Sequence, residues 1–303
     1  MTQPARQTWA AGDFPKMGVE LAIVGELLCE SIPVHAGDRV LDVGTASGNT
    51  AISAARRRAV VTGVDLVPAL LAYAQKRAQS EGFAIDFQEG DAMALSFADA
   101  SFDIVLSTFG AIFAPDPHKT TAEMARVCRP GGKIAMANWT PDSMLGKLFR
   151  LLERYSAPGS RVGAPVEWGD EAALADRLGP YVREVSVQRR SVRFRALSAE
   201  EWVEFMRTYF GPAIEAFQYS NTPVSQNALA EEMAALMREH NSAQNGTVLG
   251  TASTWKLSQR GANNPPNATA SLSGDTTVKT PYPGPASHKP HALFHKSLLR
   301  ILE

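Results

Sequence analysis

Five short apolar segments alternate with turns and helix-forming segments in the first half of the chain. They are residues 39–43, 60–65, 84–88, 102–108 and 133–139. Strands separated by helices build βαβ units, in which the strands are parallel and helices cover both faces of the sheet. The sequence therefore predicts an α/β fold built on a doubly wound, mostly parallel sheet.

The segments between these strands carry helix-end signals. Residues 50–58 place arginines at the end of the predicted helix, where the helix dipole favours positive charge. Pro68 suits the first turn of the next helix and Gly82 suits its end. A further helix is predicted over residues 116–132, stopped by Pro-Gly-Gly.

Beyond residue 139 the pattern changes to longer helices and two strands. Helices are predicted at 143–156, 198–218 and 225–241, a loop at 159–170, and strands at 182–197 and 246–260. Ser198 and Glu201 have the spacing of a capping box. The segment 182–197 alternates with period two, as an antiparallel strand does.

Three regions follow from these patterns. Residues 1–36 are predicted to be a helical entry segment, with an amphipathic helix at 17–32. Residues 37–260 are predicted to be one domain, in which 140–245 carries insertions over the mouth of the site. Residues 261–303 are rich in Pro, Asn, Thr and Ser, so we predict a disordered tail that ends in a short helix.

The bulk composition is that of a soluble globular protein, and we expect the protein to be cytoplasmic. The chain has 303 residues, 45% of them hydrophobic, and a net charge of −1, which does not point to nucleic acid as a partner. The most apolar early segment is interrupted by Glu20 and Glu26, and no signal peptide or membrane span is predicted. The two cysteines, Cys29 and Cys128, lie in predicted helices and are expected to be buried thiols.

The stretch "DVGTASGNTA", residues 42–51, joins the first strand to the first helix. Such a turn presents backbone N–H groups and the positive end of a helix dipole to a ligand. A pyrophosphate-binding turn has the pattern G-x-G-x-x-G, but Ala46 and Asn49 stand where two of its glycines are required. The stretch is therefore either another kind of nucleotide turn, built on Gly44 and Gly48, or a tight turn with no ligand.

Three more features follow the next strands in order. Asp65 ends the second strand, where a carboxylate can accept the two hydroxyls of a ribose, although Asp65 also suits a helix N-cap. Asp91 follows the third strand and can accept from an adenine amino group, although it also suits a turn. An apolar loop with two phenylalanines follows the fourth strand. Ligands of open α/β sheets bind at these strand ends, so the sequence predicts a nucleoside site.

These motifs resemble those of the class I S-adenosylmethionine-dependent methyltransferases over about residues 9–260. "VLDVGTASGNTAI" resembles the first motif of that family, with Ala46 in place of its middle glycine. "VTGVDLVPALLAYAQKRA", "EGDAMALSFADASFDIVLS" and "EMARVCRPGGKIAMANW" resemble the later motifs. "WAAGDFPKMG", "NWTP" and "FMRTYFGP" resemble the small-molecule branch with ubiquinone and menaquinone C-methyltransferase-like proteins, often labelled type 11.

The resemblance implies a Rossmann-like, seven-stranded sheet with an antiparallel pair at one edge, and S-adenosylmethionine as cofactor. It implies that Gly44, Thr45 and Gly48 shape the amino-acid pocket and that Asp42 helps to hold the ammonium group. It further assigns Asp65 to the ribose hydroxyls, with Leu66 against the adenine face. Asp91 and Ala92 would contact the adenine edge, and Thr108 would line the methionine end.

The acceptor side is less defined. Aromatic residues from several segments can line an apolar pocket for a flat acceptor such as a quinone, a phenol or a polyketide-like molecule. These are Phe14, Phe109, Phe113, Trp139, Trp168, Tyr209 and Phe210. His118 is the candidate catalytic base, although it also suits a solvated first helical turn.

Other polar features favour structural roles. His240 suits a helix end, and the arginines of 182–197 suit an exposed edge strand. No metal site is expected, although His288, His291 and His295 have tolerable spacing.

Two rival functions remain open from the sequence. One is a nicotinamide-dependent oxidoreductase, for which the pyrophosphate fingerprint and a Tyr-x-x-x-Lys pair are missing. The other is a protein that binds S-adenosylmethionine or S-adenosylhomocysteine without transferring a methyl group. A missing base does not favour this second rival, because methyl transfer to a good nucleophile needs none.

Overall fold

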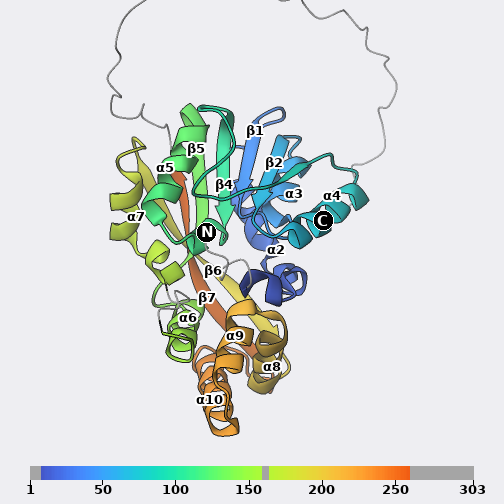
Figure 1. Ribbon diagram of the computed structural model, residues 1–303, viewed down its shortest axis with the longest axis vertical. Helices are drawn as coiled ribbons and strands as arrows, with labels where there is room; N and C mark the ends of the chain where they lie inside the picture. The colour runs from blue at the N-terminus through green and yellow to red at the C-terminus, as the bar shows by residue number, and fades with distance from the viewer. Residues whose placement is uncertain (1–7, 159–163, 260–303) are drawn as a thin grey trace, which may run out of the picture. The chain divides into compact units, whose positions relative to one another are not determined.

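The computed structural model describes residues 8–158 and 164–259. The strands are β1 (Arg39–Val43), β2 (Val60–Asp65), β3 (Asp86–Glu89), β4 (Phe102–Thr108), β5 (Cys128–Trp139), β6 (Val185–Ala196) and β7 (Val248–Gln259). They are hydrogen-bonded in the order β3-β2-β1-β4-β5-β7-β6 (Figure 1). The strands β1 to β5 are parallel, and β7 runs antiparallel to both β5 and β6. The predicted Rossmann-like α/β fold, with a parallel sheet and an antiparallel pair, is confirmed.

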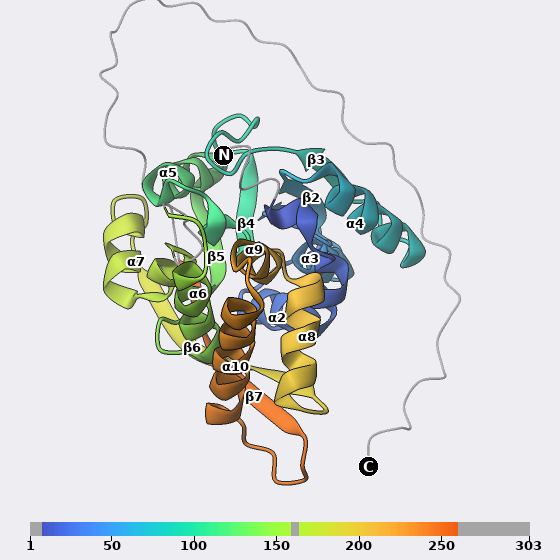
Figure 2. The ribbon, with the colours of Figure 1, turned by 60° about the horizontal axis from the view of Figure 1, so that its bottom comes forward.

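The helices cover both faces of the sheet. They are α2 (Phe14–Ser31), α3 (Asn49–Arg56), α4 (Pro68–Ser80), α5 (Pro117–Val127), α6 (Met144–Arg154), α7 (Glu171–Leu178), α8 (Ala199–Tyr209), α9 (Gly211–Tyr219) and α10 (Pro223–Glu239), with short 3₁₀ turns η1 (Ala111–Phe113) and η2 (Ala164–Gly169). Figure 2 shows α8, α9 and α10 grouped at one end, near α6.

Alternation along the strands separates two hydrophobic cores. In β1, Val40 packs in the core beneath α3 and α4, whereas Leu41 and Val43 pack in the core on the opposite face. In β4, Ile104 belongs to the first core and Val105 to the second. This period of two is what a sheet covered on both faces requires, and it leaves the strand ends free to carry the polar residues of the site.

Capping explains why several helices begin where they do. Ser198 accepts from the Glu201 N–H at 3.1 Å, and the Glu201 carboxylate accepts from the Leu197 N–H at 2.6 Å. The predicted capping box is therefore confirmed, with its return bond directed at the residue before the cap. Asp116 accepts from the Lys119 N–H at 3.0 Å, and Pro117 occupies the first turn of α5.

Two helix predictions are wrong, each because of a proline. The helix predicted over 116–132 ends at Val127, and Cys128 is a buried residue that begins β5. Pro130 lacks an N–H and disfavours helix in the residue before it, so the chain is already extended there. The helix predicted over 198–218 is divided into α8 and α9 at Phe210, because Pro212 lies in the first turn of a new helix.

The region after β5 contains one element that the sequence pattern missed. The helix α7 begins at an Asp170 cap, whose side chain accepts from the Ala173 N–H at 2.9 Å. Its eight residues are too few for the apolar period to stand out. The predicted loop 159–170 includes η2, and its residues 159–163 lie outside the described residues.

Arginines predicted to lie on an exposed edge strand are found there. The arginines Arg189, Arg190, Arg193 and Arg195 are exposed on β6, which lies at the edge of the sheet.

The division into 1–36, 37–260 and 261–303 stays a prediction, and the tail from 261 lies outside the described residues. Among helices of the two described ranges, none has the length and apolarity that crossing a membrane requires.

Candidate functional site

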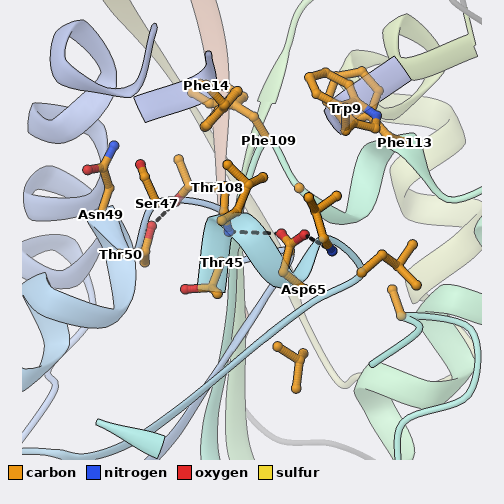
Figure 3. Close-up of a pocket in the computed structure, with 18 of the residues that line it drawn as sticks. Trp9, Phe14, Thr45, Ser47, Asn49, Thr50, Asp65, Thr108, Phe109 and Phe113 are labelled. Atoms are coloured by element: carbon orange, nitrogen blue, oxygen red, sulfur yellow. Dashed lines mark hydrogen bonds between the residues drawn. The ribbon is translucent and has the colours of Figure 1, made fainter. Parts of the chain in front are cut away.

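A pocket opens where the carboxyl ends of β1, β2 and β4 meet (Figure 3). One side is formed by the β1–α3 loop and the end of β2, and the other by aromatic residues from the N-terminal segment and from the loop after β4. The lining residues are Trp9, Phe14, Leu21, Gly44, Thr45, Ala46, Ser47, Asn49, Thr50, Val64, Asp65, Leu66, Val67, Leu70, Gly90, Ala92, Thr108, Phe109, Gly110 and Phe113. The pocket therefore lies at the sheet edge that the sequence predicted.

Two glycines allow the loops after β1 and β4 to cross. Gly44 has a φ of +69°, and a Cβ added to it would lie 2.6 Å from the Gly110 Cα. A Cβ added to Gly110 would lie 2.4 Å from the Gly44 carbonyl oxygen. Real Cβ atoms do not approach backbone this closely, so both positions require glycine.

The rest of the β1–α3 loop also uses left-handed backbone. Gly48 has a φ of +83° and caps α3, and Ala46 has a φ of +46°. A residue with a Cβ pays about 1–2 kcal/mol for this conformation. The backbone at position 46 therefore explains why the family motif has glycine there, and Ala46 fills the same turn at a modest energetic cost.

Asp65 holds the β1–α3 loop against the end of β2. One carboxylate oxygen accepts from the Ala46 N–H at 2.9 Å, and the other from the Val67 N–H at 3.0 Å. The N-cap of α4 is Val67, so Asp65 is not the cap of that helix. Burial raises the pKa of the Asp65 carboxyl, whereas hydrogen bonds from the backbone N–H groups of Val67, Ala46 and Leu66 lower it. A carboxylate oxygen can accept more than one hydrogen bond, and Asp65 lines the pocket.

Asp42 lies behind the loop and outside the pocket lining. One of its oxygens accepts from the Thr45 hydroxyl at 2.7 Å and from the Ala51 N–H at 3.0 Å. Its other oxygen, Oδ1, is buried with no hydrogen-bond partner in the described part of the chain. Burial raises the pKa of Asp42 to about 7. Since Thr45 lines the pocket, Asp42 can act on a ligand through Thr45.

The raised pKa of Asp42 predicts that acidification stabilises the protein. Between pH 4 and 7 the folded state binds a proton that the unfolded state, with a pKa near 3.8, does not bind. The free energy of unfolding should therefore fall by roughly 2–3 kcal/mol from this group between pH 5 and pH 8. Urea unfolding at both pH values measures it. Asp42→Asn should remove this part of the pH dependence, and identical slopes for variant and wild type would contradict the assignment.

Several lining residues were not predicted. The Ser47 hydroxyl is buried at the pocket without a hydrogen-bond partner among the described residues. Asn49 donates to the Gly18 carbonyl at 2.8 Å and accepts from Arg77 at 2.8 Å, so it ties α2 and α4 to the loop. Thr50 donates to the Thr108 hydroxyl at 2.8 Å. Ser47 and Thr50 belong to the stretch 42–51. Their closeness in sequence to Gly44 and Gly48 could have predicted that they line the pocket.

The opposite end of the pocket is aromatic. Trp9 packs on Phe113 with ring centroids 4.3 Å apart, and Phe14 meets Trp9 edge-on (Figure 3). Phe109 lines the pocket and stacks on Trp139 at 3.9 Å with nearly parallel rings. Phe109 has a φ of +58°, a strained conformation for a residue with a side chain. Trp139 thus supports the pocket from behind without lining it.

The N-terminal segment is held over the pocket by α8 and α9. The Asp13 N–H donates to the Tyr209 carbonyl at 3.0 Å, and Lys16 donates to the Tyr209 hydroxyl at 3.1 Å. The Thr8 hydroxyl donates to Glu215. Tyr209, predicted to line the acceptor pocket, therefore acts as an anchor for the segment that carries Trp9 and Phe14.

The remaining predicted residues lie outside the lining. Asp91 accepts from the Met93 N–H at 2.9 Å, as a turn residue does, while its neighbour Ala92 lines the pocket. His118 is exposed in the first turn of α5 and does not reach the pocket. Phe210 packs at the edge of Trp9, and the buried Trp168 stacks with Arg177. His240 ends α10, and the three histidines of the tail lie outside the described residues.

Comparison with known proteins identifies the family to which the chain belongs. Residues 41–136 match a family model described as a methyltransferase domain. A demethylmenaquinone methyltransferase of Deinococcus radiodurans is 35% identical over 187 residues, which cover 56% of this chain and 76% of the relative. The chain belongs to the class I S-adenosylmethionine-dependent methyltransferases. The resemblance inferred from the motifs is thus confirmed, and S-adenosylmethionine is the cofactor of the family.

Two further comparisons concern overall similarity and fold. An uncharacterised protein of Mycobacterium tuberculosis is 39% identical over 240 residues, covering 78% of this chain and 87% of the relative. The crystal structure of a putative methyltransferase from Bacillus halodurans superposes with a TM-score of 0.55 at 18% identity, covering 78% of this chain and 97% of that one. At that identity the structural match shows the fold of this methyltransferase and no more.

Proposed function

We propose that this methyltransferase transfers the methyl group of S-adenosylmethionine to carbon or oxygen of a small, apolar or aromatic acceptor. The observation that carries the proposal is the division of the pocket. Its β1–β2 side is polar and its other end is built from Trp9, Phe14, Phe109 and Phe113. Asp65 is the one ionisable side chain among the lining residues that the structure describes. An uncharged, flat molecule is the acceptor that such an aromatic end favours.

The polar side offers residues for each part of the cofactor. We assign Asp65 to the ribose hydroxyls, Leu66 and Ala92 to the adenine, and Thr108 to the methionine end. We add Ser47, whose buried hydroxyl at the pocket has no partner among the described residues and is the kind of group that a ligand satisfies. Gly44, Gly48 and Thr45 set the path of the loop, and Asp42 supports the charge of the bound amino acid through Thr45.

The proposed reaction depends on the positions of the acceptor and the methyl group more than on a catalytic acid or base. When bound, S-adenosylmethionine would supply a methyl group on a sulfonium, whose leaving group is a neutral thioether that needs no protonation. The chain then has to align the acceptor with the methyl group and exclude water. The aromatic end and the N-terminal segment over it serve these two tasks. An acceptor that ionises readily has already lost its proton to water, and a reactive ring carbon releases its proton to water after the methyl group is bound, so neither needs a catalytic base.

The relative from Deinococcus radiodurans suggests the first acceptor to test. Its name describes methylation of demethylmenaquinone, whose ring is flat and apolar. Incubation of the protein with methyl-labelled S-adenosylmethionine should give labelled product with reduced naphthoquinones or phenols and none with small polar amines. Product with amines alone would contradict the proposed acceptor class. Cofactor binding without turnover on any acceptor would favour the non-catalytic rival.

Phe113→Ala is predicted to separate acceptor binding from cofactor binding. It removes a ring of the proposed acceptor end, the one that packs on Trp9, so KM for the methyl acceptor should rise about 5- to 13-fold, as loss of an aromatic contact of about 1–1.5 kcal/mol implies. Calorimetry should show S-adenosylhomocysteine affinity within about threefold of wild type. Tyr219→Ala, at an exposed ring outside the pocket, is the control and should change neither value. An unaltered KM in Phe113→Ala would remove this ring from the acceptor site.

A further inference from the structure

The outer face of α2 carries an exposed apolar stripe. Val19, Ile23 and Leu27 are 73%, 59% and 52% exposed and are spaced four residues apart, so they follow one side of the helix. Lys16 precedes the stripe by three residues and Glu30 follows it by three. The opposite face of α2 is buried, and its Phe14 and Leu21 line the pocket. The stripe therefore contributes nothing to the described core.

This face is complementary to itself. The residues from Lys16 to Glu30 are spaced by three, four, four and three, in the order basic, apolar, apolar, apolar, acidic. If a second α2 runs antiparallel with Ile23 at the centre, Val19 meets Leu27 and Ile23 meets Ile23. Lys16 of each helix then lies beside Glu30 of the other. An interface related by a two-fold axis requires this kind of self-complementary surface.

We propose that two copies of this chain associate through an antiparallel pairing of their α2 helices, centred on Ile23. The end charges are available for it: the Lys16 and Glu30 side chains are 53% and 75% exposed, although each already has a partner within its own chain. Lys16 lies beside Asp13 and Tyr209, and Glu30 pairs with Arg57 at 2.5 Å. Both can therefore take a second partner without losing the first.

The neighbouring elements limit the size of this interface. A groove between α2 and β6 is lined by Leu27, Arg190 and Val192, and Arg195 lies near Glu20. The two-fold axis places the side of α2 next to Arg190 and Arg195 in one copy beside the same side in the other copy. The positive charges of the two copies repel each other there, which opposes a wider contact. The contact is thus confined to about 21 Å of helix, the length of 14 residues. An interface of this size belongs to the weak, reversible class, so we expect micromolar or weaker self-association.

Sedimentation velocity of the full chain from 5 to about 300 μM tests the proposal. Wild type should shift from monomer toward dimer as concentration rises. Ile23→Glu places two carboxylates together on the axis and should weaken dimerisation at least tenfold. Val224→Glu is the matched control, because Val224 is 81% exposed on α10, away from α2, and it should behave as wild type. Circular dichroism checks that both variants are folded.

Cysteine cross-linking tests the register. The chain has two cysteines, Cys29 and Cys128, and both are buried. Ile23→Cys should form a disulfide-linked dimer on mild oxidation, since this position meets itself on the axis, whereas Val224→Cys should not. Glu30→Lys should weaken the dimer, and adding Lys16→Glu should restore it in part.

Three results would overturn the proposal. One is a monomer at every concentration, with Ile23→Cys protected from thiol reagents, as when another segment of the chain covers the stripe. Another is a dimer that Ile23→Glu does not weaken. The third is a monomer that pellets with phosphatidylglycerol vesicles through Ile23, which would make the stripe a membrane contact. None of them bears on methyl transfer, so failure here leaves the proposed function intact.

Discussion

Gly44→Ala is expected to lower the free energy of unfolding by about 3 kcal/mol or more and to abolish cofactor binding. The new Cβ would lie 2.6 Å from the Gly110 Cα, so the loops after β1 and β4 would have to separate. The φ of +69° at this position adds about 1–2 kcal/mol of strain for a residue with a side chain. Both loops line the pocket, so their separation disturbs the site directly. Urea unfolding and calorimetry with S-adenosylhomocysteine measure the two effects.

Gly82→Ala isolates the cost of backbone conformation. Gly82 has a similar φ of +76°, but a Cβ there would meet nothing within 4 Å. We therefore expect a loss of only about 1 kcal/mol and normal cofactor affinity. If Gly44→Ala and Gly82→Ala destabilise the protein equally, the crossing of the two loops is not what fixes Gly44.

Asp65→Ala is expected to reduce the affinity for S-adenosylhomocysteine by about 2–3 kcal/mol, roughly 30- to 150-fold. In the proposed role of Asp65, the change removes a charged acceptor for two ribose hydroxyls. The change also frees the Ala46 and Val67 N–H groups, which would loosen the β1–α3 loop. Asp65→Asn keeps one acceptor oxygen and the side-chain volume, so its loss should be smaller than that of Asp65→Ala.

The matched control for Asp65 is Asp86→Ala. Asp86 is an exposed carboxylate at the start of β3, at the opposite end of the strand pair that Asp65 ends. It should bind S-adenosylhomocysteine as wild type does. Equal affinities of Asp65→Ala and Asp86→Ala would show that Asp65 serves the loop alone.

Much of the fold could be predicted because strands and helices differ in hydrophobic period. The strands β1, β2 and β4 lie where the apolar runs were, since both faces of each strand are buried. The errors arose where backbone chemistry overrides the period, at Pro130 before β5 and at Pro212 within the helix predicted over 198–218. The short helix α7 offered too few residues for any period to be read.

Some residues of the candidate site could be predicted from local sequence and others could not. Gly44, Asp65 and Ala92 follow strand ends, and the order of parallel strands brings strand ends together, so local sequence sufficed to predict them. Trp9 and Leu21 line the pocket because α8 and α9 hold the N-terminal segment across it. That contact joins residues about 200 positions apart, and no local pattern encodes it. His118 lies outside the pocket lining for the converse reason: it is close to a strand end in sequence but exposed on α5.

Calorimetric titration of the wild-type protein with S-adenosylhomocysteine and, separately, with NAD tests the central claim most directly. We assign a nucleoside and amino-acid site without a pyrophosphate seat to the left-handed β1–α3 loop, the half-buried Asp65 and the Ser47 hydroxyl, which has no partner among the described residues. We predict one site per chain with micromolar affinity for S-adenosylhomocysteine, and no heat of binding with NAD. Binding of NAD with no binding of S-adenosylhomocysteine would contradict the account.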